Sequence, residues 1–137
     1  METILIIEDE KNVRDGLCEL FDTAGYNVIS AYDGISGLSE VRSKFPDLII
    51  SDIMMPNLDG FALLQAIQSD PDTALIPFVF LTAKTDLLDI RRGMNIGADD
   101  YVTKPYRAKE LLSTVQARLK KQKVLLSKID NVIRVSS

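Results

Sequence analysis

The feature that most constrains the fold is a set of five short, unbroken apolar runs spread along a chain of 137 residues. Such runs lack the alternation of a half-exposed strand and are typical of parallel strands covered on both faces. The runs are Ile4-Leu5-Ile6-Ile7, Val28-Ile29, Leu48-Ile49-Ile50, Phe78-Val79-Phe80-Leu81 and Tyr101-Val102. We therefore expect five short strands in one sheet.

Segments with the apolar spacing of helices separate these runs. The apolar positions are Val13, Leu17, Leu20, Phe21 and Ala24; Ile35, Leu38, Val41 and Phe45; Phe61, Leu64 and Ile67; and Leu87, Ile90 and Met94. The end signals are Asp33 and Asp86 as caps, Gly25 and Gly97 beyond helix ends, and Pro46 and Asp70-Pro71 as terminators. A fifth helix is expected to begin near Arg107-Ala108.

Strand and helix thus alternate five times without an internal linker, which predicts one α/β domain. Parallel strands joined by helices need right-handed crossovers, and the result is a doubly wound open sheet with helices on both faces. Sheets of this type place their sites at the carboxyl ends of the strands, beside the topological switch point. The residues that follow each strand are therefore the candidate functional residues.

Composition excludes several classes of site and location. The chain has no histidine and a single cysteine, Cys18, which excludes imidazole-based zinc sites, histidine general bases and internal disulfides. No apolar run is long enough to span a membrane, and the residues after Met1 lack the basic segment of a signal peptide. We expect a cytoplasmic protein without a membrane partner.

Charge is distributed unevenly along the chain. Residues 1–104 hold 8 basic and 18 acidic residues, whereas residues 105–137 hold 8 basic and 2 acidic residues. The net charge is therefore −10 for the first part and +6 for the second. An acidic body argues against direct nucleic-acid binding by this domain.

Acidic side chains follow two different strands of the expected sheet. Glu8 and Asp9 come after the first strand, and Asp52 ends the third. Carboxylates gathered at one edge repel one another unless a cation neutralises them, and hard oxygen ligands without histidine or cysteine suit Mg²⁺. Glu10, the next residue, is expected only to cap the following helix. The pattern predicts a magnesium site that includes Asp9 and Asp52.

Asp52 also has the chemistry of a nucleophile, because a carboxylate can attack phosphorus and form an aspartyl phosphate. Phosphoryl transfer depends mainly on positioning and charge neutralisation. Thr82 and Lys104 follow the fourth and fifth strands and supply a hydroxyl donor and a positive charge at the same edge. Pro56 and Gly60 shape the loop after Asp52.

Over about residues 3–122 the sequence resembles the receiver domain of two-component response regulators. The stretches that carry the resemblance are Ile6-Ile7-Glu8-Asp9-Glu10, Leu48 to Pro56, Asp59-Gly60, Leu81-Thr82-Ala83, Gly97-Ala98-Asp99-Asp100-Tyr101 and Lys104-Pro105. The resemblance implies a flavodoxin-like (βα)5 fold with strand order 2-1-3-4-5. It also implies a cis peptide bond before Pro105.

The resemblance assigns a role to each candidate residue. Asp52 is the phosphoacceptor, and Thr82 and Lys104 contact the phosphoryl oxygens. The expected Mg²⁺ ligands are Asp9, Asp52 and the backbone carbonyl of Met54, with Glu8 acting largely through water. Tyr101 is the switch aromatic, which turns inward when Thr82 moves toward the phosphoryl group. All these residues match the family pattern at their positions in this chain.

The same resemblance implies a signalling protein rather than an enzyme that turns over a substrate. A sensor histidine kinase or a phosphotransfer protein donates the phosphoryl group in a reaction that the receiver itself catalyses, and slow autodephosphorylation follows. The surface made by the fourth helix, the fifth strand and the fifth helix then changes toward an effector or a fused output domain. This surface is also a candidate homodimer interface.

The end of the chain predicts a long helix. Its apolar positions alternate in steps of four and three residues, which is a heptad pattern with one polar position, Gln122. The positions are Ala108, Leu112, Val115, Leu119, Gln122, Leu126, Ile129 and Ile133. We expect residues 1–122 to form the domain and residues 123–137 a helical extension or linker, which pairs with a second copy or joins an output domain, although Asp130 and Asn131 favour helices poorly.

Three other functions fit parts of the pattern. A flavodoxin-type carrier needs a hydroxyl- and glycine-rich phosphate loop after the first strand, where this chain has Glu8-Asp9-Glu10. An Mg²⁺-dependent phosphatase with an aspartate nucleophile usually has a second acid two residues later, where this chain has Met54. A pure interaction module would not need the full acidic site.

Overall fold

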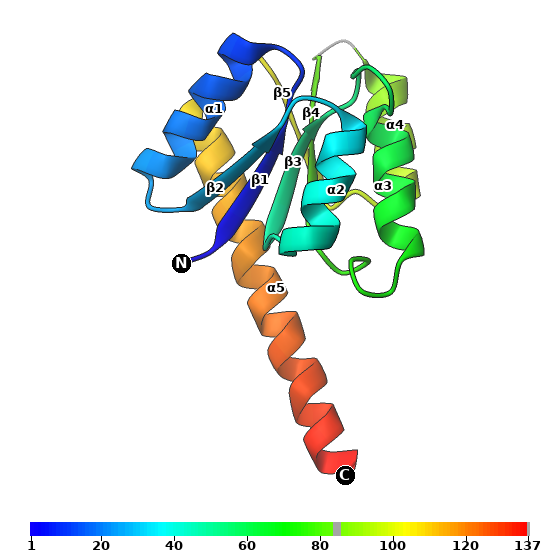
Figure 1. Cartoon of the computed structure of the whole chain (residues 1–137). Coiled ribbons are helices and arrows are strands. Elements are labelled where there is room, and N and C mark those ends of the chain that lie inside the picture. Colours follow the sequence, from blue (N-terminus) through cyan, green and yellow to red (C-terminus); the bar gives the residue numbers. More distant parts are fainter. Residues whose placement is uncertain (84–85, 137) are drawn as a thin grey trace.

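The computed structural model describes residues 1–83 and 86–136. It contains a parallel sheet of five strands in the order β2-β1-β3-β4-β5, which confirms the doubly wound fold (Figure 1). The strands are β1 (Thr3–Ile7), β2 (Asn27–Ala31), β3 (Leu48–Asp52), β4 (Phe78–Ala83) and β5 (Asp100–Lys104). The helices are α1 (Lys11–Thr23), α2 (Gly34–Lys44), α3 (Gly60–Ser69), α4 (Leu87–Ile96) and α5 (Ala108–Ser136).

Helices cover both faces of the sheet, α1 and α5 on one face and α2, α3 and α4 on the other (Figure 1). Successive residues of a strand point to opposite faces. On β1, Ile4 and Ile6 therefore join the core under α1 and α5, whereas Leu5 and Ile7 join the core under α2 and α3. This two-sided burial explains why the strand runs are apolar without alternation.

Apolar spacing predicts the buried face of α2 only in part, since Val41 is buried and Leu38 packs on the core, and it predicts that of α4 poorly. The side chains of Ile35 and Leu87 are 59% and 72% exposed, and Phe45 and Met94 are also exposed. The buried positions include glycines, and an added Cβ at Gly93 would lie only 2.8 Å from the Phe80 ring. Because glycine lets a helix backbone approach the sheet closely, apolar side chains are not needed there.

The helix-end signals are only partly correct. Asp33 caps α2, where its carboxylate accepts a hydrogen bond of 2.8 Å from the Ser36 backbone N–H. Gly25 and Gly97 follow helix ends with positive φ angles of 98° and 126°. Glu10 and Asp86 occupy the N-cap positions of α1 and α4, but neither side chain makes a capping hydrogen bond, so both cap predictions are wrong. The backbone of Asp86, with φ −92° and ψ 61°, lacks the extended conformation that is usual for an N-cap residue.

The helix α5 begins on the sheet and continues well beyond it (Figure 1). Leu111, Val115 and Leu119 are buried against the sheet. The expected Ala108 is exposed and Leu112 is half-buried, because Leu111 lies on the side of the helix that faces the sheet. We call residues 123–136 the extension. Among the described residues, no helix combines the length and apolar character needed to cross a membrane.

Two contacts hold the beginning of the extension against the body of the domain. The Gln122 side-chain amide donates a 2.6 Å hydrogen bond to the backbone carbonyl of Leu75, in the loop before β4. Next to it, Lys123 Nζ lies 3.6 Å from a carboxylate oxygen of Glu2. These contacts fix the direction in which the extension leaves the domain.

Candidate functional site

Three carboxylates meet at the carboxyl edge of the sheet, as the sequence predicts. Glu8 and Asp9 directly follow β1, and Asp52 is the last residue of β3, which is hydrogen-bonded to β1. One carboxylate oxygen from each residue lies within 4.8 Å of the others. Glu8 is buried, Asp52 is half-buried and Asp9 is exposed, so the group opens toward solvent on one side. We call these three residues the acidic cluster.

Lys104 brings a positive charge to the acidic cluster from the end of β5. Its Nζ lies 2.9 Å from Asp52 Oδ2 and 3.5 Å from Glu8 Oε1. The peptide bond between Lys104 and Pro105 is cis, as the resemblance implies. The ends of three strands therefore contribute to one charged site. Two of its residues, Glu8 and Lys104, are 96 positions apart in the sequence.

The crowding of charge changes the protonation of Glu8. Burial, a hydrogen bond with Asp52 and repulsion from the Asp52 carboxylate together raise the pKa of Glu8 from 4.5 to about 8, although Lys104 acts in the opposite direction. Burial also lowers the pKa of Lys104, but the hydrogen bond to Asp52 and the attraction of Asp52 and Glu8 outweigh it, and the net pKa is raised. Lys104 therefore keeps its positive charge in the site.

The acidic cluster has the chemistry of a divalent cation site. Glu8 Oε2 is buried and has no hydrogen-bond partner among the described residues, which is costly for a carboxylate oxygen. One ammonium group does not balance three carboxylates, and oxygen donors without histidine or sulfur suit Mg²⁺. The residues present therefore fit the magnesium ion that the sequence predicts.

The backbone after β3 holds the Asp52 side chain in place. Asp52 Oδ1 accepts a 2.8 Å hydrogen bond from the Ile53 backbone N–H, which leaves Oδ2 to Lys104. The loop then closes through a 2.8 Å hydrogen bond from the Gly60 N–H to the Ile53 carbonyl. A Cβ on Gly60 would lie 2.5 Å from the Asp52 carbonyl oxygen, so only glycine fits this turn without a shift.

Thr82 and Met54 lie near the same end of the sheet, whereas Tyr101 is the second residue of β5 and pairs with Phe80. Thr82 is buried on β4, one residue beyond Leu81, the register partner of Asp52. Tyr101 lies on the edge strand β5 with 41% of its side chain exposed. Met54 follows Asp52 by two residues, and its side chain is 73% exposed. Thr82 is thus placed on the strand next to that of Asp52, and Tyr101 is on the surface.

Sequence reasoning missed two residues that support the site. Arg14 on α1 donates from Nη1 to the backbone carbonyls of Glu8 and Asp9, at 2.8 Å and 3.4 Å, and so fixes the acidic turn. Asn57 has a left-handed φ of 70°, and its amide donates a 2.6 Å hydrogen bond to Asp33. The preference of asparagine for positive φ is a signal for this turn, whereas nothing in the sequence indicates the contact of Arg14.

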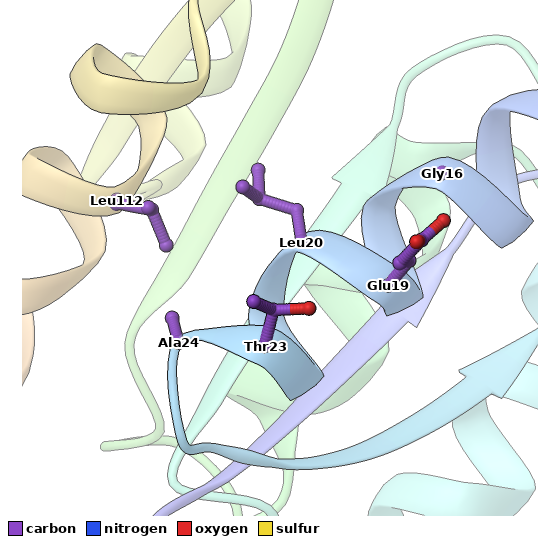
Figure 2. A pocket seen from close by; sticks show the side chains of 6 residues that line it. All are labelled: Gly16, Glu19, Leu20, Thr23, Ala24 and Leu112. Atoms are coloured by element: carbon purple, nitrogen blue, oxygen red, sulfur yellow. The ribbon is translucent and has the colours of Figure 1, made fainter.

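A hollow of about 360 Å³ lies between α1 and α5, away from the acidic cluster. Figure 2 shows Leu20 of α1 and Ala24, the residue after α1, opposite Leu112 of α5, with Glu19 and Thr23 beside them. Its lining is mostly apolar and brings no set of reactive groups together. The chemistry of this chain is therefore to be sought in the acidic cluster.

Comparison with known proteins decides the family. The family model described as "Response regulator receiver domain" matches residues 4–116. The chain belongs to this family. The receiver is 41% identical over 121 residues to the "DNA-binding dual master transcriptional regulator RpaA" of Synechocystis, and 39% identical over 122 residues to the "Response regulator ArlR" of Staphylococcus aureus. These matches cover 88% and 89% of the receiver but only 50% and 54% of the relatives, so it spans about half their length.

Solved structures agree with this family. A putative response regulator from Chloroflexus aurantiacus superposes with the receiver at a TM-score of 0.84 and 33% identity, covering 87% of this chain and 98% of that one. The chemotaxis response regulator CheY4 of Vibrio cholerae gives 0.81 and 30%, covering 86% and 98%. NtrX from Brucella abortus gives 0.88 and 26%, covering 94% of this receiver but 29% of that longer chain.

Proposed function

We propose that this receiver is a phosphorylation-activated switch in which Asp52 accepts a phosphoryl group from a sensor histidine kinase or a phosphotransfer protein. The observation that carries the proposal is the acidic cluster, in which three carboxylate oxygens lie within 4.8 Å of one another and Lys104 lies 2.9 Å from Asp52. An isolated surface aspartate would have none of these neighbours. The protein acts as substrate and as part of the catalyst, without turnover of a further substrate.

In the proposed reaction an oxygen of the Asp52 carboxylate attacks phosphorus. A bond between oxygen and phosphorus forms while the bond from phosphorus to the donor breaks, and the donor leaves with that electron pair. Lys104, which lies beside Asp52 and Glu8, stays charged and also contacts a phosphoryl oxygen. A bound Mg²⁺ would neutralise charge on the phosphoryl oxygens; Asp9, Asp52 and the Met54 carbonyl would hold it directly, and Glu8 through water.

The signal then passes from the site to the surface. The phosphoryl group attracts the hydroxyl of Thr82, which is buried on the neighbouring strand. Movement of Thr82 makes room for the ring of Tyr101, now 41% exposed, to turn inward. This change alters the surface of α4, β5 and α5, where Leu87 and Leu88 are 72% and 82% exposed and available to a partner.

The partner in this proposal is an output domain or a separate effector. RpaA is named as a DNA-binding transcriptional regulator, and the match covers only half of it. We propose residues 1–122 as the receiver unit and 123–137 as the extension toward an output, with Ser137 outside the described residues. Homodimers through α4, β5 and α5 or through the extension are part of the same proposal.

The proposal is tested with acetyl phosphate as the donor in the presence of Mg²⁺. Intact mass is expected to rise by one phosphoryl group in the wild-type protein and to stay unchanged in Asp52→Asn. The matched control is Asp72→Asn, which removes an exposed carboxylate of the loop before β4 and is expected to react like the wild type. An equal mass gain in Asp52→Asn would remove Asp52 from its assigned role.

A further inference from the structure

The extension carries an apolar stripe, which we define as Leu125, Leu126, Ile129 and Ile133. These side chains are 44%, 46%, 39% and 61% exposed. They lie beyond Leu119, the last residue of α5 that is buried on the sheet. Four exposed large apolar residues on one side of a charged helix indicate a contact surface.

The stripe faces the same way as the part of α5 that covers the sheet. Val115 and Ile133 are 18 residues apart, which is about five turns at 3.6 residues per turn, and Leu119 and Leu126 are about two turns apart. The stripe therefore faces the space below the body of the domain. A hollow of about 200 Å³ lies where the two meet, and its lining includes Pro46, Leu75 and Leu126.

This geometry argues against parallel pairing of two extensions in register along the stripe. The heptad positions of α5 before Gln122 face the sheet of their own domain, and Val115 and Leu119 are fully occupied by it. A parallel partner helix in register would continue into the space that this sheet fills. A second copy avoids this overlap when it approaches from below, with its own domain at the far end.

We propose that the stripe binds the stripe of a second copy of this chain in an antiparallel, two-fold dimer. Packing of alternating heptad positions sets Leu126 against the partner's Ile129, and Gln122 against the partner's Ile133. The tip of each extension then fills the hollow under the other domain. Both copies use the same surface, so the contact closes as a dimer and does not continue into a fibre.

Charge supports a second copy as the occupant. Residues 123–136 carry three basic side chains and one acidic side chain, whereas Asp47 and Asp72 line the hollow under the domain. An antiparallel dimer places each extension, which has a net charge of +2 over residues 123–136, below the other domain, where these two aspartates lie. This arrangement specifies the homodimer through the extension that is part of the proposed function, and its test does not depend on phosphorylation of Asp52.

The dimer is tested first by sedimentation of the whole chain at roughly 100 µM, because a short stripe predicts micromolar affinity. The wild type is expected at twice the chain mass of 15.3 kDa. Ile129→Glu is expected to raise the dissociation constant at least about tenfold. The matched control Val124→Glu changes an exposed apolar residue on the opposite side of the helix and is expected to stay dimeric.

A monomeric wild type would overturn the proposal and leave the stripe to an output domain or another partner. Equal weakening by Val124→Glu and Ile129→Glu would also overturn it, since the contact would then not be on the stripe. Both changes are on exposed positions of the extension, so the folded domain is expected to be unaffected, and circular dichroism verifies this.

The orientation is tested by disulfide formation in proteins that carry Cys18→Ser to remove the native thiol. Gln122→Cys and Ile133→Cys proteins are expected to cross-link to each other when mixed and oxidised, and neither is expected to cross-link to itself. In a parallel pair these positions would be about 16 Å apart, at 1.5 Å per residue, and each would meet its own copy. Self-cross-linking of Ile133→Cys without the mixed product would overturn the antiparallel arrangement.

Discussion

Glu8 connects the charge of the site to the stability of the protein. Its side chain is 2% exposed, and two neighbouring carboxylates act on it together with one ammonium group. A carboxyl group in such a place binds its proton more tightly in the folded state than in the unfolded state. The free energy of unfolding in metal-free buffer should therefore depend on pH through this residue.

We predict that the metal-free protein loses stability as pH rises from about 4.5 to about 8. The pKa of Glu8 is raised from 4.5 to about 8 in the folded state. Because the folded protein binds this proton more tightly, the proton's contribution to the free energy of unfolding is fully present below pH 4.5 and is lost as pH rises through 8. Denaturant unfolding with EDTA should show a loss on the order of a few kcal/mol across this range.

Glu8→Gln is the control for this pH dependence, because a neutral amide does not titrate. Asp99, whose pKa burial also raises, is present in both proteins, so the difference between them isolates Glu8. An identical pH slope in the wild type and in Glu8→Gln would contradict the prediction.

Thr82 is predicted to be needed for the change in partner affinity that follows phosphorylation, but not for the phosphorylation of Asp52 itself. Its hydroxyl is buried on β4, beside the strand that carries Asp52. Thr82→Ala should accept a phosphoryl group from acetyl phosphate but lose the phosphorylation-dependent change in partner affinity, whereas Thr82→Ser keeps the hydroxyl and the response. Calorimetric titration of the partner measures the difference, and an unchanged response in Thr82→Ala would argue against this switch.

At the scale of elements, glycine positions decide how closely the helices and loops approach the sheet. Gly37 and Gly93 let α2 and α4 lie against Ile7 and Phe80, and Gly60 lets the loop after β3 turn next to Asp52. Gly16, in contrast, has no atom within 4 Å of an added Cβ. The same substitution should therefore have opposite effects at different glycines.

Gly60→Ala is predicted to destabilise the protein by roughly 1–3 kcal/mol, because the added methyl group would meet the Asp52 carbonyl at 2.5 Å and the Phe80 ring at 2.8 Å. The resulting shift of the loop should also slow phosphorylation of Asp52. Gly16→Ala, inside α1, should stabilise by up to about 1 kcal/mol and leave phosphorylation unchanged. Thermal unfolding and intact mass measure both effects; a neutral Gly60→Ala would disprove the steric argument.

At the scale of the whole molecule, the body and the extension are held by different forces. The body has a two-sided apolar core around the sheet, whereas polar contacts of Gln122 and of Lys123, the first residue of the extension, hold α5 to it below the sheet. The boundary after Gln122 is thus predicted to separate a self-sufficient receiver from a helix that needs another surface.

Removal of residues 123–137 is predicted to leave the acidic cluster and its reaction unchanged. The free energy of unfolding of the monomer should fall by less than about 1 kcal/mol, because an exposed ion pair such as that of Lys123 with Glu2 contributes little. Dilute protein should be used for thermal unfolding, and intact mass follows phosphorylation. A large loss of stability would show that the extension belongs to the domain.

The heptad pattern predicts the length of α5 but only part of the side of α5 that is buried. It correctly predicts a long helix, even across Asp130 and Asn131, because apolar spacing reports which side of a helix will be covered. It assigns Ala108 and Leu112 to the buried side, but Leu111 is buried, because the angle at which α5 meets the sheet selects the covered side. The exposed apolar residues of α4 show the same limit.

The sequence by itself determines the strands, the α/β class and the edge at which Glu8, Asp9, Asp52 and Lys104 gather, because strand ends in a parallel sheet share one edge. Tertiary structure alone decides the distances among these groups, the burial that raises the pKa of Glu8, and the direction of the stripe below the domain. These properties depend on segments far apart in the chain, and local periodicity carries no information about them.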